Sequence, residues 1–262
     1  MAIPLVEVQT VQASALKTLF ECLKEVLHEV PLVFHPVDGI SVLQMDFGKS
    51  SLVSLTLDAA AFDAYHVTST VAAGVASETM FRVFKTAGVN DVVTIRMDSA
   101  DHIKFIITND TTGKVSTYTV QVCEVDRCHY QAPSEHTFNA VIKIPSREFS
   151  RLFRDMKNIS DHPKGKTVTI DRLIDKIRLT CTGDAVDQQV EIAYADVDVE
   201  SPPTVVSGCF SLGHLAMYAK CSSLCAVTTL YMNSDPKFPL IIDYLIASLG
   251  KLRIVLAPVD QG

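Results

Sequence analysis

The chain has 262 residues, 48% of them hydrophobic, and its 23 Lys and Arg against 30 Asp and Glu give a net charge of −7. This composition provides a core for one large or two small domains and argues against a uniformly basic nucleic-acid-binding domain. No apolar run is long enough to span a bilayer, and residues 1–10 are unlike a signal peptide, so we expect a cytosolic or nuclear protein with reduced cysteines.

Most of the chain is predicted to be β-structure, because apolar and β-branched residues alternate with polar ones over short segments. In the first half the predicted strands are 40–45, 52–57, 92–97, 103–108 and 115–122. In the second half they are 138–144, 167–171, 176–182, 189–194, 205–210, 227–232, 240–246 and 252–256.

Four segments are predicted to be helices instead: 14–29, 77–87, 146–159 and 213–221. The first begins at Ser14, a favourable N-cap, and ends before Pro31. The second begins at Ser77 and ends at Gly88, a residue that commonly follows the last helical turn.

The order of these elements repeats, and so do single residues. Four residues recur 133 positions later, namely Leu19, Phe20, Leu23 and Lys24 as Leu152, Phe153, Met156 and Lys157. Four more recur 135 positions later, namely Lys85, Val92, Thr94 and Met97 as Lys220, Val227, Thr229 and Met232. We interpret the chain as two similar domains, 1–122 and 138–262, joined by a connector at 123–137.

Each predicted helix has one apolar side and one basic side. Arg147, Arg151 and Arg154 fall within about 60° of one another at 3.6 residues per turn. Lys17 and Lys24 share a face of their helix, and Arg82 and Lys85 are neighbours three residues apart.

The charge of the chain is unevenly distributed. The four predicted helices hold nine basic and six acidic residues, a net +3, so the rest of the chain carries −10. A positive helical surface on an acidic body suits a protein that touches phosphates with one face only. The alternative is an ordinary solvated helix face.

No catalytic or metal-binding pattern is found. The spacing Cys123-x4-Cys128-His129 lacks a second pair at zinc spacing, and Cys221 and Cys225 fit core thiols. The sequence contains no P-loop, GxGxxG, GxSxG or HExxH pattern. We therefore expect no catalysis, no cofactor and no metal.

Several segments, in order and over nearly the whole chain, resemble the proliferating cell nuclear antigen (PCNA) family of DNA sliding clamps. They include Leu43-Gln44-Met45-Asp46, Phe62-Asp63-Ala64-Tyr65, Lys85-Thr86-Ala87-Gly88, Pro145-Ser146-Arg147-Glu148-Phe149, Pro239-Leu240-Ile241-Ile242-Asp243-Tyr244 and Leu256-Ala257-Pro258. The resemblance implies an α+β DNA-clamp fold, in which two similar domains with outer antiparallel sheets and inner basic helices form a homotrimeric ring around double-stranded DNA. The positions that match DNA-facing family positions are Lys17, Lys24, Arg82, Lys85, Arg151, Arg154 and Lys220.

The resemblance also implies partners: DNA polymerase, the clamp loader and other replication and repair proteins, which dock through a short motif with a Gln and apolar anchors. The matching positions are Met45, Lys49, Leu52, Ala132, Pro133, Pro239, Ala257 and Pro258. Ser50 and Val255 replace more apolar or aromatic residues, so we expect a less apolar pocket and weaker peptide binding. The alternative for Met45 and Leu52 is simple core filling.

For the subunit interface, the resemblance implies an edge strand with Tyr118 that pairs with a strand carrying Val190 and Ile192. It places the protein in the nucleus, or in a viral replication compartment if the source is a virus. Two alternatives share the fold: a subunit of a heterotrimeric checkpoint-type clamp and a monomeric processivity factor. An acidic β-rich enzyme or receptor domain without DNA function is the alternative from a different class.

Overall fold

The computed structural model describes residues 3–124, 138–159, 167–182, 186–193, 198–199 and 205–259. The chain forms two compact units. The first consists of Met1–Lys49, Val53–Tyr130 and Leu245–Leu252, and the second of Ser50–Leu52, Gln131–Tyr244 and Arg253–Gly262. The predicted domain limits at 122 and 138 stay a prediction, since most of the connector lies outside the described residues.

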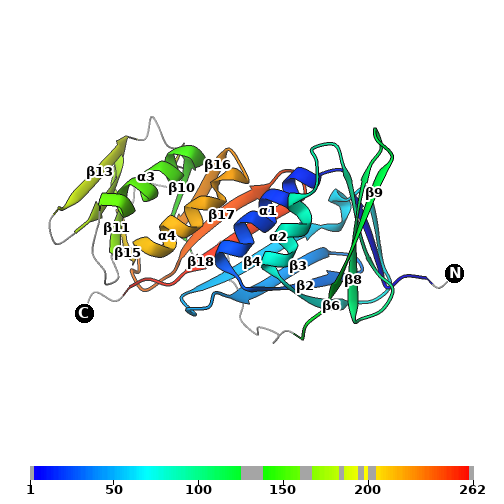
Figure 1. Ribbon diagram of the computed structural model, residues 1–262. Coiled ribbons are helices and arrows are strands. Elements are labelled where there is room, and N and C mark those ends of the chain that lie inside the picture. The colour runs from blue at the N-terminus through cyan, green and yellow to red at the C-terminus, as the bar shows by residue number, and fades with distance from the viewer. Residues whose placement is uncertain are drawn as a thin grey trace. The chain divides into compact units, whose positions relative to one another are not determined.

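The first unit is built from β-strands and two helices (Figure 1). Its elements are β1 (Val6–Thr10), α1 (Ala13–Val26), β2 (Glu29–His35), β3 (Gly39–Met45), β4 (Ser51–Asp58), η1 (Ala59–Ala61), β5 (Ala64–Val67), β6 (Val71–Ala76), α2 (Ser77–Lys85), β7 (Val92–Met97), β8 (His102–Asn109) and β9 (Lys114–Gln121). One antiparallel sheet has the order β5-β1-β7-β8-β9. In the other, β2 lies between β3 and β6.

The second unit repeats this arrangement. Its elements are β10 (Ala140–Pro145), α3 (Ser146–Ile159), β11 (Thr167–Arg172), β12 (Lys176–Cys181), β13 (Gln188–Ala193), β14 (Asp198–Val199), β15 (Val206–Ser211), α4 (Leu212–Tyr218), the 3-10 helix η4 (Ala219–Ser223), β16 (Val227–Met232), β17 (Leu240–Ile246) and β18 (Gly250–Leu256). β10 pairs with β14 and β16 as β1 pairs with β5 and β7. β11 lies between β12 and β15 as β2 lies between β3 and β6. The internal repeat is therefore a structural repeat.

Apolar side chains fix the helices of each unit. The rings of Phe20 in α1 and Phe84 in α2 stack with centroids 4.8 Å apart, and Phe84 meets Phe105 of β8 edge-on. In α3, Phe149 and Phe153 pack with centroids 4.8 Å apart and both are fully buried. Burial of such aromatic side chains supplies much of the free energy of folding. The opposite sides of α2 and α3 carry the exposed residues Arg82, Lys85, Arg151 and Arg154.

Several sequence predictions about local structure are wrong. The helix predicted to reach Glu29 ends at Val26, because Leu27 is extended and Glu29 already pairs with Ala76 at the start of β2. β1, β2, β5 and β6 were not predicted as strands. Ser77 does not cap α2, because its hydroxyl donates instead to the carbonyls of Leu27 and His28.

The helices also differ at two other ends. The N-cap of α1 is Gln12 rather than Ser14, and its side chain makes no capping hydrogen bond. The segment predicted as one helix over 213–221 is split into α4 and η4, and it begins after Ser211, whose hydroxyl accepts a hydrogen bond from the His214 amide. Among the described residues, no helix is long and apolar enough to cross a membrane.

Candidate nucleic-acid interface

Three lysines on α1 and α2 fold back against other groups of the protein. The Lys24 Nζ atom sits 3.8 Å from the centroid of the Phe81 ring, and Lys85 Nζ lies 5.8 Å from the same centroid. The Lys24 side chain is only 22% exposed. The Lys17 ammonium donates to the Ala87 carbonyl at 3.5 Å. Cation–π and backbone contacts therefore limit how far these lysines reach into solvent.

The basic side chains of α3 are more exposed. Arg151 and Arg154 have side-chain exposures of 62% and 66%. Arg151 is 2.8 Å from the Glu148 carboxylate, and Arg154 is 3.4 Å from Asp155. Hydrogen bonding to Glu148 raises the pKa of Arg151, so its positive charge is maintained. Ion pairs this exposed are weak, so the guanidinium groups can exchange their carboxylates for other anions.

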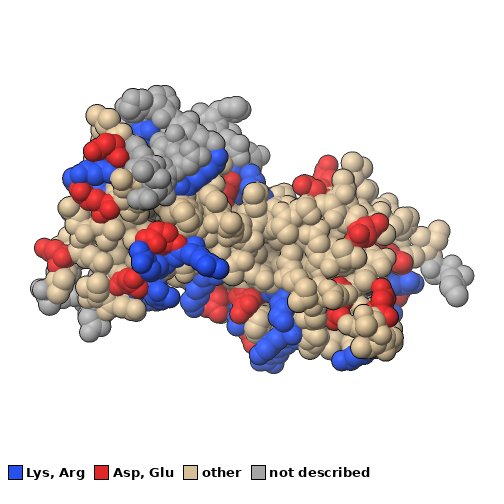
Figure 2. All heavy atoms as spheres, turned by 90° about the horizontal axis from the view of Figure 1, so that it is seen from above, with Lys and Arg blue, Asp and Glu red and all other residues tan. Residues whose placement is uncertain are grey.

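Acidic side chains lie beside basic ones on the molecular surface, as Figure 2 shows. Arg82, for example, pairs with Glu78 at 3.3 Å on the exposed face of α2. Because Glu29 belongs to β2, the helical elements hold nine basic but five acidic residues, one acid fewer than the sequence predicted. The positive excess of the helices is thus larger than expected.

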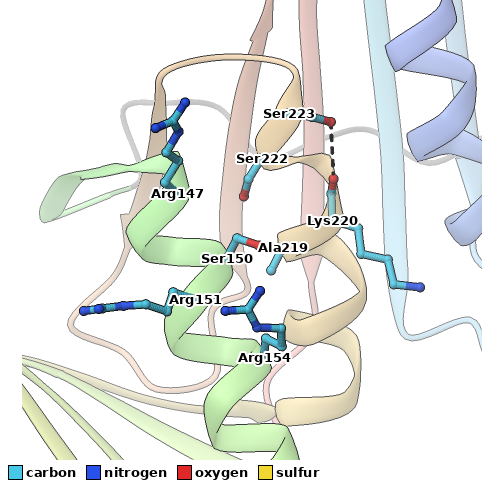
Figure 3. Close-up of a pocket in the computed structure, with 8 residues that line it drawn as sticks. All are labelled: Arg147, Ser150, Arg151, Arg154, Ala219, Lys220, Ser222 and Ser223. Atoms are coloured by element: carbon cyan, nitrogen blue, oxygen red, sulfur yellow. Dashed lines mark hydrogen bonds between the residues drawn. The ribbon is translucent and has the colours of Figure 1, made fainter.

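A hollow of about 430 Å³ lies between α3 and η4. It is lined by Arg147, Ser150, Arg151, Arg154, Ala219, Lys220, Ser222 and Ser223. Figure 3 shows the hydroxyls of Ser150 and Ser222 and the guanidinium of Arg154 between the two elements, with the other basic side chains extending outward from the rim. Three arginines and a lysine line this one hollow, and these are the side-chain types that bind carboxylate and phosphate groups in proteins.

Two further strands lie at the ends of their sheets, where backbone groups on one side have no partner strand among the described residues. β9 ends the five-stranded sheet and carries Tyr118, whose hydroxyl donates to Thr86 Oγ1 at 3.0 Å. β13 ends the sheet β13-β12-β11-β15, and its Val190 and Ile192 are half-buried. Such edges are ready to pair with another strand.

The sequence matches the family models for both halves of one protein. Residues 5–130 match the proliferating cell nuclear antigen N-terminal domain, and residues 133–259 match its C-terminal domain. The chain is also 31% identical, over 97% of both chains, to a probable DNA polymerase sliding clamp of Paramecium bursaria Chlorella virus 1. This chain belongs to the PCNA family of sliding clamps. The family resemblance and the two-domain clamp fold expected from the sequence are confirmed.

The structure places all seven predicted DNA-binding residues on α1, α2, α3 or η4. Five of them are solvent-exposed: Arg82, Lys85, Arg151, Arg154 and Lys220. Lys17 and Lys24 are half-buried. Their contact with DNA stays a prediction.

The predicted partner-binding residues of this PCNA-family chain are distributed over both units. Met45 is half-buried and Lys49 is exposed in the first unit, while Leu52 is 7% exposed in the second. In the second unit Pro239 and Pro258 are half-buried and Ala257 is exposed. Ala132 and Pro133 lie outside the described residues. Their grouping into one pocket stays a prediction.

Two exposed residues, the aromatic Phe47 and the basic Arg147, were not among the site residues predicted from the sequence. Phe47 is 87% exposed in a turn closed by a hydrogen bond from the Lys49 amide to the Asp46 carbonyl, and its ring meets His28 edge-on. The sequence Asp46-Phe47-Gly48 could have indicated an exposed aromatic residue in a turn. Arg147 was placed on the basic face of α3 by periodicity but was left out of the DNA-binding set.

A metal centre is not found among the described residues, where no three His, Cys, Asp or Glu side chains come together. Cys128 and His129 lie outside these residues. Cys221 is buried and Cys225 is half-buried, and neither forms a disulfide.

Proposed function

We propose that this chain is a DNA sliding clamp, a processivity factor that encircles duplex DNA as a homotrimer and tethers replication and repair proteins to it. The observation that carries this proposal is that both repeats of a PCNA-family chain present an exposed basic helix surface. The protein itself carries out no catalysis in this role and needs no cofactor.

The DNA contacts would be to backbone phosphates. Lysine and arginine side chains that point away from an apolar core can bind phosphate without reading bases. The candidates are Lys17, Lys24, Arg82, Lys85, Arg151, Arg154 and Lys220. Because the whole chain has a net charge of −7, free protein is repelled by DNA at long range. Attraction is confined to the helix surfaces, so the hold on DNA is topological.

Ring closure would come from β9 and β13 of neighbouring subunits. Each lies at the end of its sheet, and antiparallel pairing between them would satisfy backbone groups that are otherwise left to solvent. Glu191 on β13 is held by Lys176 at 2.7 Å and Arg178 at 2.9 Å, which lowers its pKa and fixes the exposed face of that strand. Val190 and Ile192 then face the other side of the strand.

Partner proteins would dock through a peptide motif at the surface that includes Met45, Lys49, Leu52, Ala132, Pro133, Pro239, Ala257 and Pro258. The main-chain amide of Ala257 already donates to the Ser50 carbonyl at 3.0 Å. A bound peptide would therefore use the Ala257 carbonyl rather than its amide. We place this activity in the nucleus or, in keeping with the viral relative, in a viral replication compartment.

The decisive experiment is retention on DNA. The purified protein is loaded onto a nicked circle and onto linear duplex, and both are moved into high salt. Encirclement predicts that protein stays on the circle and leaves linear DNA, because salt weakens phosphate contacts but not a topological link. Equal loss from both would contradict encirclement.

Light scattering of the free protein tests the assembly. A homotrimer has three times the mass of one chain. A stable monomer that still stimulates polymerase would support a monomeric processivity factor. Trimer formation only with a different chain would support a heterotrimeric checkpoint-type clamp.

A further inference from the structure

The hollow between α3 and η4 is open to solvent and has a basic lining. Its volume of about 430 Å³ lies within the range of small-ligand sites, and every lining residue except Ala219 is an arginine, a lysine or a serine. Four of its lining residues are cationic, namely Arg147, Arg151, Arg154 and Lys220. Figure 3 shows the Arg154 guanidinium between α3 and η4, while the Arg151 and Lys220 side chains extend away from the hollow. None of the described residues that line it is acidic.

Two groups at this hollow are without partners in the described part of the chain. The Ser222 hydroxyl is shielded from solvent and makes no hydrogen bond there. Polar groups shielded in this way are normally satisfied, so an unpaired one marks a position where a ligand oxygen or water belongs. Arg147, the second residue of α3, is exposed and makes no ion pair or hydrogen bond with the described residues.

The remaining cations differ from Arg147 in one respect. Arg151 and Arg154 each lie next to a carboxylate, Glu148 or Asp155, outside the residues that line the hollow. An incoming anion must compete with these carboxylates for them. Among the described residues no carboxylate pairs with Arg147, so its guanidinium can make a two-pronged contact with phosphate oxygens without displacing one.

We propose that the hollow docks a backbone phosphodiester of duplex DNA and that Arg147 and Ser222 are binding residues there. This inference rests on the proposed clamp function and extends it. Arg147 supplies a cation without an ion pair among the described residues. Arg154, which lies beside Asp155, supplies a cation between α3 and η4, and the Ser150 and Ser222 hydroxyls supply neutral donors. The second unit would then hold DNA at a discrete position rather than through diffuse attraction alone.

The test compares two substitutions that remove one positive charge from the same helix. Arg147→Gln removes a residue that lines the hollow, whereas Lys157→Gln removes an exposed residue of α3 that does not. The full-length variants are titrated with a fluorescent linear duplex over a range of salt concentrations. Arg147→Gln should lower the slope of log K against log salt by about 0.9 for each phosphate that the variant no longer neutralises. Lys157→Gln should leave the slope unchanged.

Ser222→Ala provides a second, uncharged arm. Removing a neutral donor to a phosphate should weaken DNA binding about tenfold or more at one salt concentration, because hydrogen bonds to charged groups are comparatively strong. The salt slope should stay the same, because no counterion is involved. Equal effects of Arg147→Gln and Lys157→Gln, with no effect of Ser222→Ala, would overturn the inference.

The source of the phosphate is tested with inorganic phosphate in a calorimeter, without DNA. We expect no measurable binding of free phosphate to the wild type. Binding that Arg147→Gln abolishes, together with an unchanged DNA salt slope, would show a free-anion site and overturn docking of DNA. Retention of wild-type protein on nicked circles distinguishes failure of the clamp function from failure of phosphate docking at the hollow. If it is retained but the two glutamine variants behave alike, only the hollow fails; if it is not retained, the clamp function itself fails.

Discussion

The helices of the two units hold similar numbers of basic residues, four on α1 and α2 and five on α3 and η4, but present them differently. On α1 and α2 the Lys24 and Lys85 ammoniums lie over Phe81, and Lys17 bonds to a backbone carbonyl. On α3 and η4, arginines extend into solvent around a hollow. Charge count alone therefore does not describe a phosphate-binding surface; the reach of each cation matters as much.

The largest expected effect comes from reversing charge on the two surfaces separately. Arg151→Glu with Arg154→Glu should reduce loading and polymerase stimulation more than about tenfold, because both side chains are highly exposed and can contact phosphates in two-pronged fashion. Lys17→Glu with Lys24→Glu should have a smaller effect, since these side chains are half-buried. Both variants should keep the wild-type mass in light scattering. Equal reductions would contradict the difference between the surfaces.

Ring assembly is expected to be the next most sensitive property, and it affects both surfaces equally. Tyr118→Ala should weaken trimer formation by about 2 kcal/mol, a typical value for an aromatic residue central to an interface. Tyr118→Phe is the matched control, because it removes only the hydroxyl that donates to Thr86. Dilution followed by mass measurement gives both dissociation constants. Unchanged trimer stability in the alanine variant would argue against pairing through β9.

A smaller effect is expected when Phe81 is replaced. Phe81→Ser releases Lys24 and Lys85 from the ring, a contact worth about 0.5–1 kcal/mol at an exposed site. DNA affinity should change by no more than about fivefold, which corresponds to the upper end of that energy range. The salt slope should not change, because the number of charges is the same. Phe81→Leu should behave like Phe81→Ser if the ring face matters, and like the wild type if only apolar packing does.

The smallest effect on DNA is expected from a change remote from both helix surfaces. Phe47→Ser removes a ring that is 87% exposed, so it should leave folding and DNA binding unaltered. Binding of a clamp-interaction peptide should weaken by about 1 kcal/mol if the motif covers roughly 40 Å² of this ring, at about 25 cal/mol per Å². Calorimetry with the peptide measures this change. If the Phe47→Ser variant binds the peptide as tightly as the wild type, the motif does not contact Phe47.

Much of the fold could be predicted from alternation and periodicity. The apolar faces of α1 and α3 were predicted because Leu19, Leu23, Leu152 and Phe153 recur at helical spacing, and all four are buried. β2 was missed because its apolar residues continue directly from the helix before it, and Pro31 looked like a terminator although it pairs opposite Gly74. Local signals could not separate a helix end from the start of a strand when two to three residues lie between them.

The sequence by itself determined the repeat, the amphipathic helices and the family, because each depends on the order and spacing of residues along the chain. Only the tertiary structure decided how the cations are presented. Phe81 lies beneath Lys24, and Ser222 comes to face the arginines of α3, from segments about 60 and 70 residues away, respectively. Contacts at such separations depend on how helices pack against one another. Periodicity within one helix does not show which residues of another helix lie beside it.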